Sequence, residues 1–254
     1  GETIVALNQF DEDFLIADMD NLSDLQPKSI NTTDSAIPQI HDALVLGIRD
    51  YFVKMGFSKA TLGLSGGIDS AVTLALAQKA LGSENIRVLL LPSLYSSQHS
   101  VDDAVALANH LGVKYNIVNI DDAFLSVKNS MNDIFEGLPE DLTEENIQAR
   151  IRGVMLMALS NKLGHLLLNT SNKSEVAVGY GTLYGDMCGA ISVLGDVYKT
   201  DVFALAHYIN KKEEIIPENT IIKPPSAELR PDQKDSDSLP EYDTLDRILF
   251  QYIE

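Results

Sequence analysis

The chain has 254 residues, 45% of them apolar, which is enough for one large domain or for one domain with attached segments. Its formal net charge of −18 at pH 7 argues against a general basic surface for DNA or RNA, and no apolar run has the length of a membrane span. The single cysteine, Cys188, excludes an internal disulfide and a cysteine-built zinc site, and it is consistent with a cytoplasmic protein.

Residues 1–35 differ in composition from the rest of the chain. Apolar runs at 3–7 and 14–17 predict the two strands of a hairpin, which is not stable alone. The polar, turn-rich residues that follow are typical of a linker. The first helix is predicted over 37–55, with Pro38 in its first turn and apolar residues at helical spacing.

From residue 60 onward, apolar runs alternate with helical patterns. The predicted strands are 60–64, 86–91, 114–120 and 165–170, and the predicted helices are 69–81, 100–111, 121–135, 144–163 and 200–211. This alternation predicts an α/β protein, with a doubly wound parallel sheet and helices on both faces. Ligands of such sheets bind beyond the carboxyl ends of the strands, at a switch point. Residues 212–240, rich in proline and charge, predict a loop or tail.

The segment Ser65-Gly66-Gly67-Ile68-Asp69-Ser70 lies between the first of these strands and its helix. Glycines let backbone N–H groups approach an anion, and a helix N-terminus adds a favourable dipole. No Gly-Lys-Ser/Thr follows, so the segment is not a Walker A loop. The segment predicts a phosphate-binding loop, with a plain tight turn as the alternative.

Two acids and one lysine occupy similar places at helix starts. Asp69 and Glu175 each follow a strand end, and together they suit Mg²⁺, which prefers a few carboxylates with phosphate oxygens and water. Taken singly, each acid is also an ordinary helix-terminus charge. Lys199 opens a helix, where a cation is unfavourable to the helix dipole, and this indicates an anionic partner.

Three further segments carry polar residues. Asn146 and Arg150 are four apart on one predicted helix, which Thr143 is expected to cap, and they share a face. For an isolated arginine, a solvated surface position is the alternative. The glycine-rich residues 179–186 are a weak signal, and residues 223–229 form a rigid loop with one hydroxyl, Ser226.

In this order, six segments resemble the synthetase domain of NAD+ synthetases over roughly residues 37–248. The segments are SGGIDS, ENIQAR, TSNKSE, GYGTLYGD, YKTDV and KPPSAEL. SGGIDS alone resembles the wider ATP pyrophosphatase superfamily. GYGTLYGD is similar to the glutamine-dependent branch, because the ammonia-dependent branch carries a lysine where Leu183 stands and an aspartate near Ala190.

The resemblance implies a fold like that of the adenine nucleotide alpha hydrolases and an activity. The activity is ATP-dependent amidation of deamido-NAD+ (nicotinic acid adenine dinucleotide) to NAD+, through an adenylated intermediate, with release of AMP and pyrophosphate. Asp69 and Lys199 are implied as catalytic residues, and Asp69 and Glu175 as ligands of Mg²⁺. Asn146, Arg150 and Glu175 are implied to bind deamido-NAD+. The residues implied to bind ATP are Gly63, Leu64, Ser65, Gly66, Gly67, Ile68, Asp69, Ser70, Gln98, Thr170, Lys199 and Ser226.

The resemblance also implies a domain organisation and partners. Residues 1–20 are similar to the tail of a nitrilase-like glutaminase domain that releases ammonia from glutamine, residues 21–36 are a linker, and residues 37–254 are a synthetase domain that lacks the family's basic C-terminal segment. Cys188 is then structural and not the glutaminase nucleophile. A homodimer or a larger oligomer is expected, with no nucleic acid and no membrane as partner.

Three alternatives share the glycine loop. A GMP synthetase-like enzyme would adenylate xanthosine monophosphate. A non-catalytic nucleotide-binding module would not need a second acid at Glu175. A tRNA-thiolating enzyme is disfavoured by the acidic composition and the single cysteine.

Overall fold

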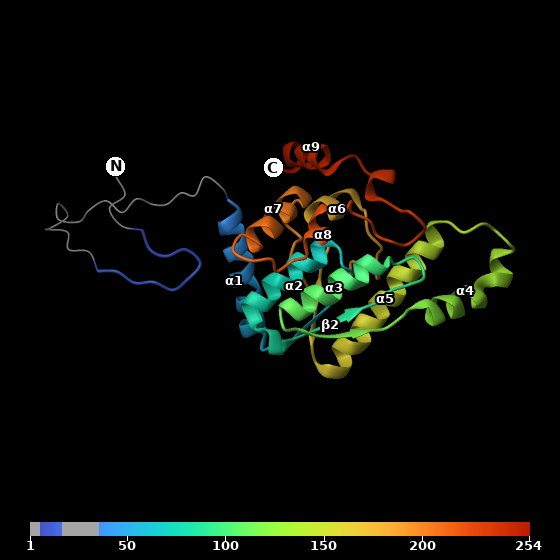
Figure 1. The fold of residues 1–254 in the computed structure, drawn as a ribbon, viewed down its shortest axis with the longest axis horizontal. Helices are drawn as coiled ribbons and strands as arrows, with labels where there is room; N and C mark the ends of the chain where they lie inside the picture. Colours follow the sequence, from blue (N-terminus) through green and yellow to red (C-terminus); the bar gives the residue numbers. More distant parts are fainter. Residues whose placement is uncertain (1–5, 17–35) are drawn as a thin grey trace.

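The computed structural model describes residues 6–16 and 36–254. Within them, five strands form one sheet in the order β3-β2-β1-β4-β5, and every pairing is parallel. Helices lie around this sheet (Figure 1). Helices α1, α2 and α7 contact one another, whereas α5 packs on β1 and β4. The predicted α/β class and the doubly wound sheet are therefore confirmed.

Four of the five strands were predicted. They are β1 (Ala60–Gly63), β2 (Ile86–Leu90), β3 (Lys114–Ile117) and β4 (Leu166–Asn169). The fifth strand, β5 (Ile191–Ser192), was not predicted, because two residues are too few to show a strand periodicity in the sequence. Because β1 pairs with both β2 and β4, the order of the strands reverses between β1 and β4, which makes this the switch point.

Most of the long helices match the prediction closely. They are α1 (Ile37–Met55), α2 (Ile68–Leu81), α3 (Gln98–His110), α4 (Asp121–Phe135), α5 (Leu142–Leu163) and α7 (Lys199–Ile209). Helix α6 (Lys173–Val178) was expected only as a helix start at Glu175, and α8 (Glu218–Ile222) and α9 (Tyr242–Ile253) were not predicted. Of these, α8 interrupts the predicted loop.

The cap of α5 differs from the expectation. Asp141, and not Thr143, caps the helix, since the Asp141 carboxylate accepts from the backbone N–H of Thr143 at 2.8 Å. The Glu144 carboxylate accepts in return from the N–H of Asp141, also at 2.8 Å. This reciprocal capping box begins the helix one residue before Thr143.

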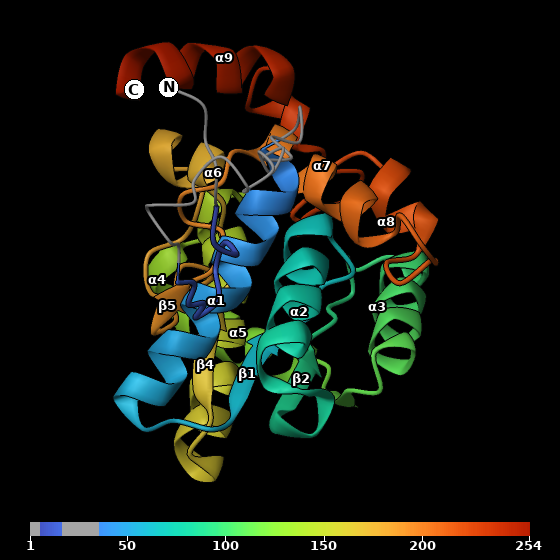
Figure 2. The ribbon, with the colours of Figure 1, turned by 90° about the vertical axis from the view of Figure 1, so that its left-hand side faces the viewer.

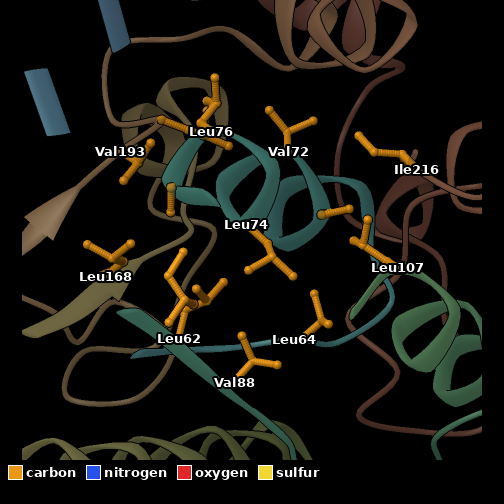
Figure 3. Packing of buried hydrophobic residues seen from close by; sticks show 14 of the residues in the cluster. Leu62, Leu64, Val72, Leu74, Leu76, Val88, Leu107, Leu168, Val193 and Ile216 are labelled. Carbon is orange, nitrogen blue, oxygen red and sulfur yellow. The ribbon is translucent and has the colours of Figure 1, made fainter. Parts of the chain in front are cut away.

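The main core lies between α2 and the sheet. Figure 3 shows Leu62 and Val88 of the strands facing Leu74 of α2, with Leu168 of β4 beside them. Helix α2 is apolar on nearly all sides, as expected for a helix that other elements cover all round. Its N-terminus is therefore held rigidly, together with the glycine loop that precedes it.

The predicted N-terminal hairpin is wrong as far as the structure describes it. Residues 6–16 contain a turn and no strand, and Phe14 is 81% exposed. A two-stranded ribbon without a covering layer gains too little burial to persist. The remainder of the hairpin and nearly all of the predicted linker lie outside the described residues. In the part of the chain that is described, no helix is long and apolar enough to cross a membrane.

Candidate active site

A cavity of about 310 Å³ lies at the carboxyl ends of β1, β2 and β4, at the switch point. Loops from distant parts of the chain surround it, including residues 223–229. Most of the predicted site residues line it. They are Gly63, Leu64, Ser65, Gly67, Ile68, Asp69, Ser70, Thr170, Glu175, Lys199 and Ser226.

The glycine loop is braced by its own hydroxyls. Ser70 Oγ accepts from the backbone N–H of Ser65 at 3.2 Å and donates to the carbonyl of Gly67 at 3.0 Å. The N–H of Gly67 donates to Ser65 Oγ at 3.1 Å. Gly67 is the N-cap residue of α2 and provides no side-chain cap, which leaves N–H groups of the first turn for an anion.

Gly66 does not line the cavity but faces α3. Its φ is 83°, in the left-handed region, and a Cβ atom there would lie 2.1 Å from the backbone oxygen of Ser100. Only glycine allows the loop to pass this close to α3.

A buried cluster of one lysine and two acids stands beside the loop. Lys199 Nζ donates to Asp69 Oδ2 at 2.6 Å and to Glu175 Oε1 at 3.0 Å, and its side chain is 2% exposed. Asn172 Nδ2 donates to Asp69 Oδ1 at 2.8 Å. The three charged groups come from α2, α6 and α7, so that Lys199 has two anionic partners within the protein itself.

The pKa values of this cluster show an excess of negative charge. Burial and the charge of Asp69 raise the pKa of Glu175 to about 7, although Lys199 opposes this. Burial alone would lower the pKa of Lys199, but the carboxylates of Asp69 and Glu175 outweigh it and raise that pKa. Two carboxylates thus share one ammonium group, and a further cation would relieve their repulsion.

This donor set suits a hard cation that completes its shell elsewhere. Residues 6–16 and 36–254 contain no group of three or more His, Cys, Asp or Glu side chains placed to hold a metal. Mg²⁺ characteristically takes only one or two carboxylates and adds phosphate oxygens and water. Asp69 and Glu175, next to the glycine loop, fit that requirement.

Besides Gly66, three predicted residues do not line the cavity. Gln98 is exposed at the start of α3 and donates from Nε2 to Asp102 at 2.8 Å. Asn146 and Arg150 do share a face of α5, where both contact residues 179–186. Thr182 Oγ1 donates to Asn146 Oδ1 at 2.6 Å, and Arg150 Nε donates to the carbonyl of Leu183 at 3.2 Å.

Several charged residues of the cavity wall were not among the predicted site residues, and Arg152 and Glu228 are two of them. Arg152 donates from Nε to the carbonyl of Leu91 at 2.9 Å, and burial lowers its pKa to about 10. Arg152 is two residues after Arg150, so the two side chains lie on different faces of α5. This spacing was the signal in the sequence that Arg152 does not share the position of Arg150.

The other residue, Glu228, links the cavity wall to α3 through hydrogen bonds. Its carboxylate accepts from Ser97 Oγ at 2.9 Å, from the Ser97 backbone N–H at 3.2 Å and from Ser100 Oγ at 2.7 Å. In the sequence, Glu228 could have been identified as a candidate because it lies two residues after Ser226 in the proline-rich loop.

The family model described as NAD synthase matches residues 40–254. The glutamine-dependent NAD(+) synthetase of Acinetobacter baylyi is 49% identical over 261 residues, which cover 100% of this chain and 48% of that protein. The enzyme of the same name from Thermotoga maritima is 53% identical over 214 residues, which cover 84% of this chain and 37% of that protein. The chain therefore spans less than half the length of these relatives.

Two solved structures extend the likeness to the fold. The glutamine-dependent NAD+ synthetase of Acinetobacter baumannii, in complex with ADP, has a TM-score of 0.75 and 45% identity over 90% of this chain and 41% of that one. NMN synthetase from Francisella tularensis has a TM-score of 0.78 and 29% identity over 86% of this chain and 87% of that one. With the family model matching nearly all residues from 40 onward and relatives of this identity, the chain belongs to the NAD synthase family.

Proposed function

We propose that this chain amidates deamido-NAD+ to NAD+ at the expense of ATP, with AMP and pyrophosphate as the other products. The observation that carries the proposal is the contact of Lys199 with Asp69 and Glu175 beside a phosphate-type loop, in a member of the NAD synthase family. Charge neutralisation on a triphosphate is what this arrangement provides, without any protein nucleophile.

The reaction has two steps. The carboxylate of deamido-NAD+ attacks the α-phosphorus of ATP, pyrophosphate leaves, and a mixed anhydride with AMP forms. Ammonia then attacks the acyl carbon, and AMP leaves as NAD+ forms. The N–H groups of the first turn of α2, residues 68–70, bind the departing pyrophosphate, and Lys199 donates to phosphate oxygens as their charge grows. Asp69 and Glu175 would hold Mg²⁺, which when bound neutralises the triphosphate.

The remaining site residues are assigned by their places in the family segments. We assign Asn146, Arg150 and Glu175 to deamido-NAD+, and the contact of α5 with residues 179–186 supports one continuous surface for the first two. Gln98 is assigned to the ATP ribose and would have to release Asp102 to reach it. The residues assigned to ATP are Gly63, Leu64, Ser65, Gly66, Gly67, Ile68, Asp69, Ser70, Gln98, Thr170, Lys199 and Ser226.

We also propose the context in which the chain works. Residues 1–20 are the tail of a glutaminase domain, residues 21–36 a linker and residues 37–254 the synthetase domain, in a homodimer or larger oligomer of the cytoplasm. Glutamine is then the source of ammonia. The greater length of the glutamine-dependent relatives supports this organisation, and the single cysteine agrees with a reducing compartment.

The test follows pyrophosphate and NAD+ together, with ATP, Mg²⁺, deamido-NAD+ and ammonium chloride. We expect both products from this chain and neither from Asp69→Ala. Nicotinic acid mononucleotide and xanthosine monophosphate serve as competing acceptors, and preference for either would overturn the assignment. If this chain makes neither product, the measurement is repeated with flanking segments attached. Absence of both pyrophosphate and NAD+ from that longer protein would refute the proposal.

A further inference from the structure

Helix α9 packs on α6 and α7, at the edge of the molecule beyond the sheet (Figure 1, Figure 2). Leu245 and Leu249 of this helix are both buried, and the ring of Phe250 lies 6.4 Å from that of Tyr198. The same buried face carries a carboxylate, Asp246, which is 6% exposed. Burying a carboxylate is costly unless it is well hydrogen-bonded, so its partners are informative.

Asp246 bonds to the two helices that carry the lysine and one acid of the site. Its Oδ1 accepts from Ser174 Oγ of α6, and its Oδ2 accepts from the backbone N–H of Thr200 of α7 at 2.9 Å. Ser174 Oγ in turn accepts from the backbone N–H of Lys199 at 2.8 Å. Tyr198, the N-cap residue of α7, provides no side-chain cap, so these bonds satisfy the first N–H groups of that helix.

The position of these bonds in the chain matters more than their number. Ser174 directly precedes Glu175, and Thr200 directly follows Lys199. One carboxylate therefore bonds to the side-chain hydroxyl of the residue before Glu175 and to the backbone N–H of the residue after Lys199. The ring of Tyr242, also on α9, lies 5.0 Å from Lys199 Nζ. Helix α9 therefore contacts the ammonium end of this lysine directly and reaches its backbone N–H through the Ser174 hydroxyl.

We propose that Asp246 is a positioning residue, which sets Lys199 and Glu175 against Asp69 so that they meet the triphosphate in one geometry. The inference rests on the proposed function for its kinetic test, but not for its binding test. A purely structural cap on α7 is the competing explanation, because a carboxylate at a helix N-terminus stabilises the helix by itself.

The first test compares three variants by pyrophosphate release. Asp246→Ala removes both acceptors, whereas Asp246→Asn keeps an acceptor for Thr200 and can donate to the Ser174 hydroxyl. Asp243→Ala removes an exposed carboxylate of the same helix and serves as the control. We expect kcat to fall about tenfold in Asp246→Ala with the KM for deamido-NAD+ unchanged, and to stay within about threefold in Asp246→Asn. Equal losses in Asp246→Ala and Asp243→Ala would overturn the proposal.

The second test is a double-mutant cycle on the dissociation constant of ATP with Mg²⁺, measured by calorimetry. If Asp246 acts through Lys199, Asp246→Ala weakens binding by about tenfold in the wild-type chain and by less than about twofold in Lys199→Gln. Equal effects in both backgrounds would show a structural cap only and refute the proposal. This readout needs no turnover, so a chain that binds ATP without making NAD+ would defeat the proposed function alone.

Ser174→Ala protects the test against loss of folding. It removes the hydroxyl that links Asp246 to the Lys199 backbone while leaving the carboxylate bonded to Thr200. We expect the same direction of change as in Asp246→Ala. Wild-type ATP binding in a folded Ser174→Ala protein would also overturn the proposal.

Discussion

Lys199 Nζ lies 2.6 Å from Asp69 Oδ2, across a separation of 130 residues in the chain. The contact joins the helix that follows the first strand of the sheet to a helix that follows the last one. It also places the ammonium group between two acids, and the consequences of that placement are measurable.

Lys199→Gln should lower both stability and turnover. Removing one partner of a buried ion pair leaves uncompensated charge, so we expect the free energy of unfolding to fall by about 3 kcal/mol. Turnover of ATP should fall about 100-fold or more, since a donor to the phosphates is lost. Urea unfolding and pyrophosphate release provide the two measurements.

The matched control is Lys54→Gln. Lys54 donates to Asp50 at 2.7 Å within α1, but its side chain is 73% exposed. A surface pair of this kind contributes at most about 0.5 kcal/mol. Comparable destabilisation by the two substitutions would contradict the role given to burial.

The pKa of Glu175 predicts how the stability of the metal-free protein depends on pH. That pKa is raised to about 7, whereas a glutamate in an unfolded chain titrates near about 4.3. The folded state therefore holds the proton more tightly. The resulting stabilisation is fully present below the unfolded-state pKa and is lost as pH rises through the folded-state pKa.

Glu175→Gln removes this titration. In EDTA, the stability of the variant relative to wild type should rise between about pH 5 and about pH 8. Chemical denaturation across that range is the measurement, and Glu218→Gln, at an exposed position on α8, is the control. A difference that stays constant with pH would count against the raised pKa.

Gly66→Ala should disrupt the phosphate loop. The substitution combines a left-handed φ, which costs about 1–3 kcal/mol for other residues, with a contact of 2.1 Å between the new Cβ and the Ser100 carbonyl. Loss of ATP binding and a clear drop in thermal midpoint are expected. Gly47→Ala, in the interior of α1 with nothing within 4 Å, should instead stabilise by about 0.5–1 kcal/mol. Tolerance of alanine at Gly66 would show that the loop does not need this approach to α3.

Glu228→Gln should loosen the cavity wall without unfolding the protein. Three donors from Ser97 and Ser100 converge on the carboxylate, and an amide offers one acceptor oxygen together with a donor group. We expect the KM for ATP to rise about tenfold, because hydrogen bonds to a charged group contribute about 1.5–3 kcal/mol each. Steady-state kinetics decide this, and an unchanged KM with a lower melting temperature would assign Glu228 a structural role only.

Local signals in the sequence explain what was predicted. Helix α1 was placed correctly because Pro38 lies in its first turn and its apolar residues recur at helical spacing, and the glycine loop was recognised from residues that are contiguous in sequence. Helix α9 was missed although Leu245 and Leu249 show helical spacing, since one such pair is weak evidence.

Features that depend on tertiary packing could not be predicted from the sequence. The burial of Arg152 depends on its neighbours in the cavity wall, and the need for glycine at position 66 depends on where α3 passes. The position of Lys199 at a helix start indicated an anionic partner. The contact with Asp69, however, depends on the order of the strands, which the sequence does not show locally.

The bonds made by α9 have a consequence for the order of events on the ribosome. Residues 65–70 are synthesised early and can fold with β1 and α2, but Lys199 and Asp246 are added much later. A nascent chain therefore carries a phosphate loop without the lysine that completes it. On the proposed function, ATP would stabilise the folded chain only after Lys199 has been added, because a ligand stabilises only the state that binds it. On the proposal for Asp246, a translation product that stops short of α9 contains Lys199 but lacks the carboxylate that positions it, and we expect it to bind ATP more weakly than the complete chain.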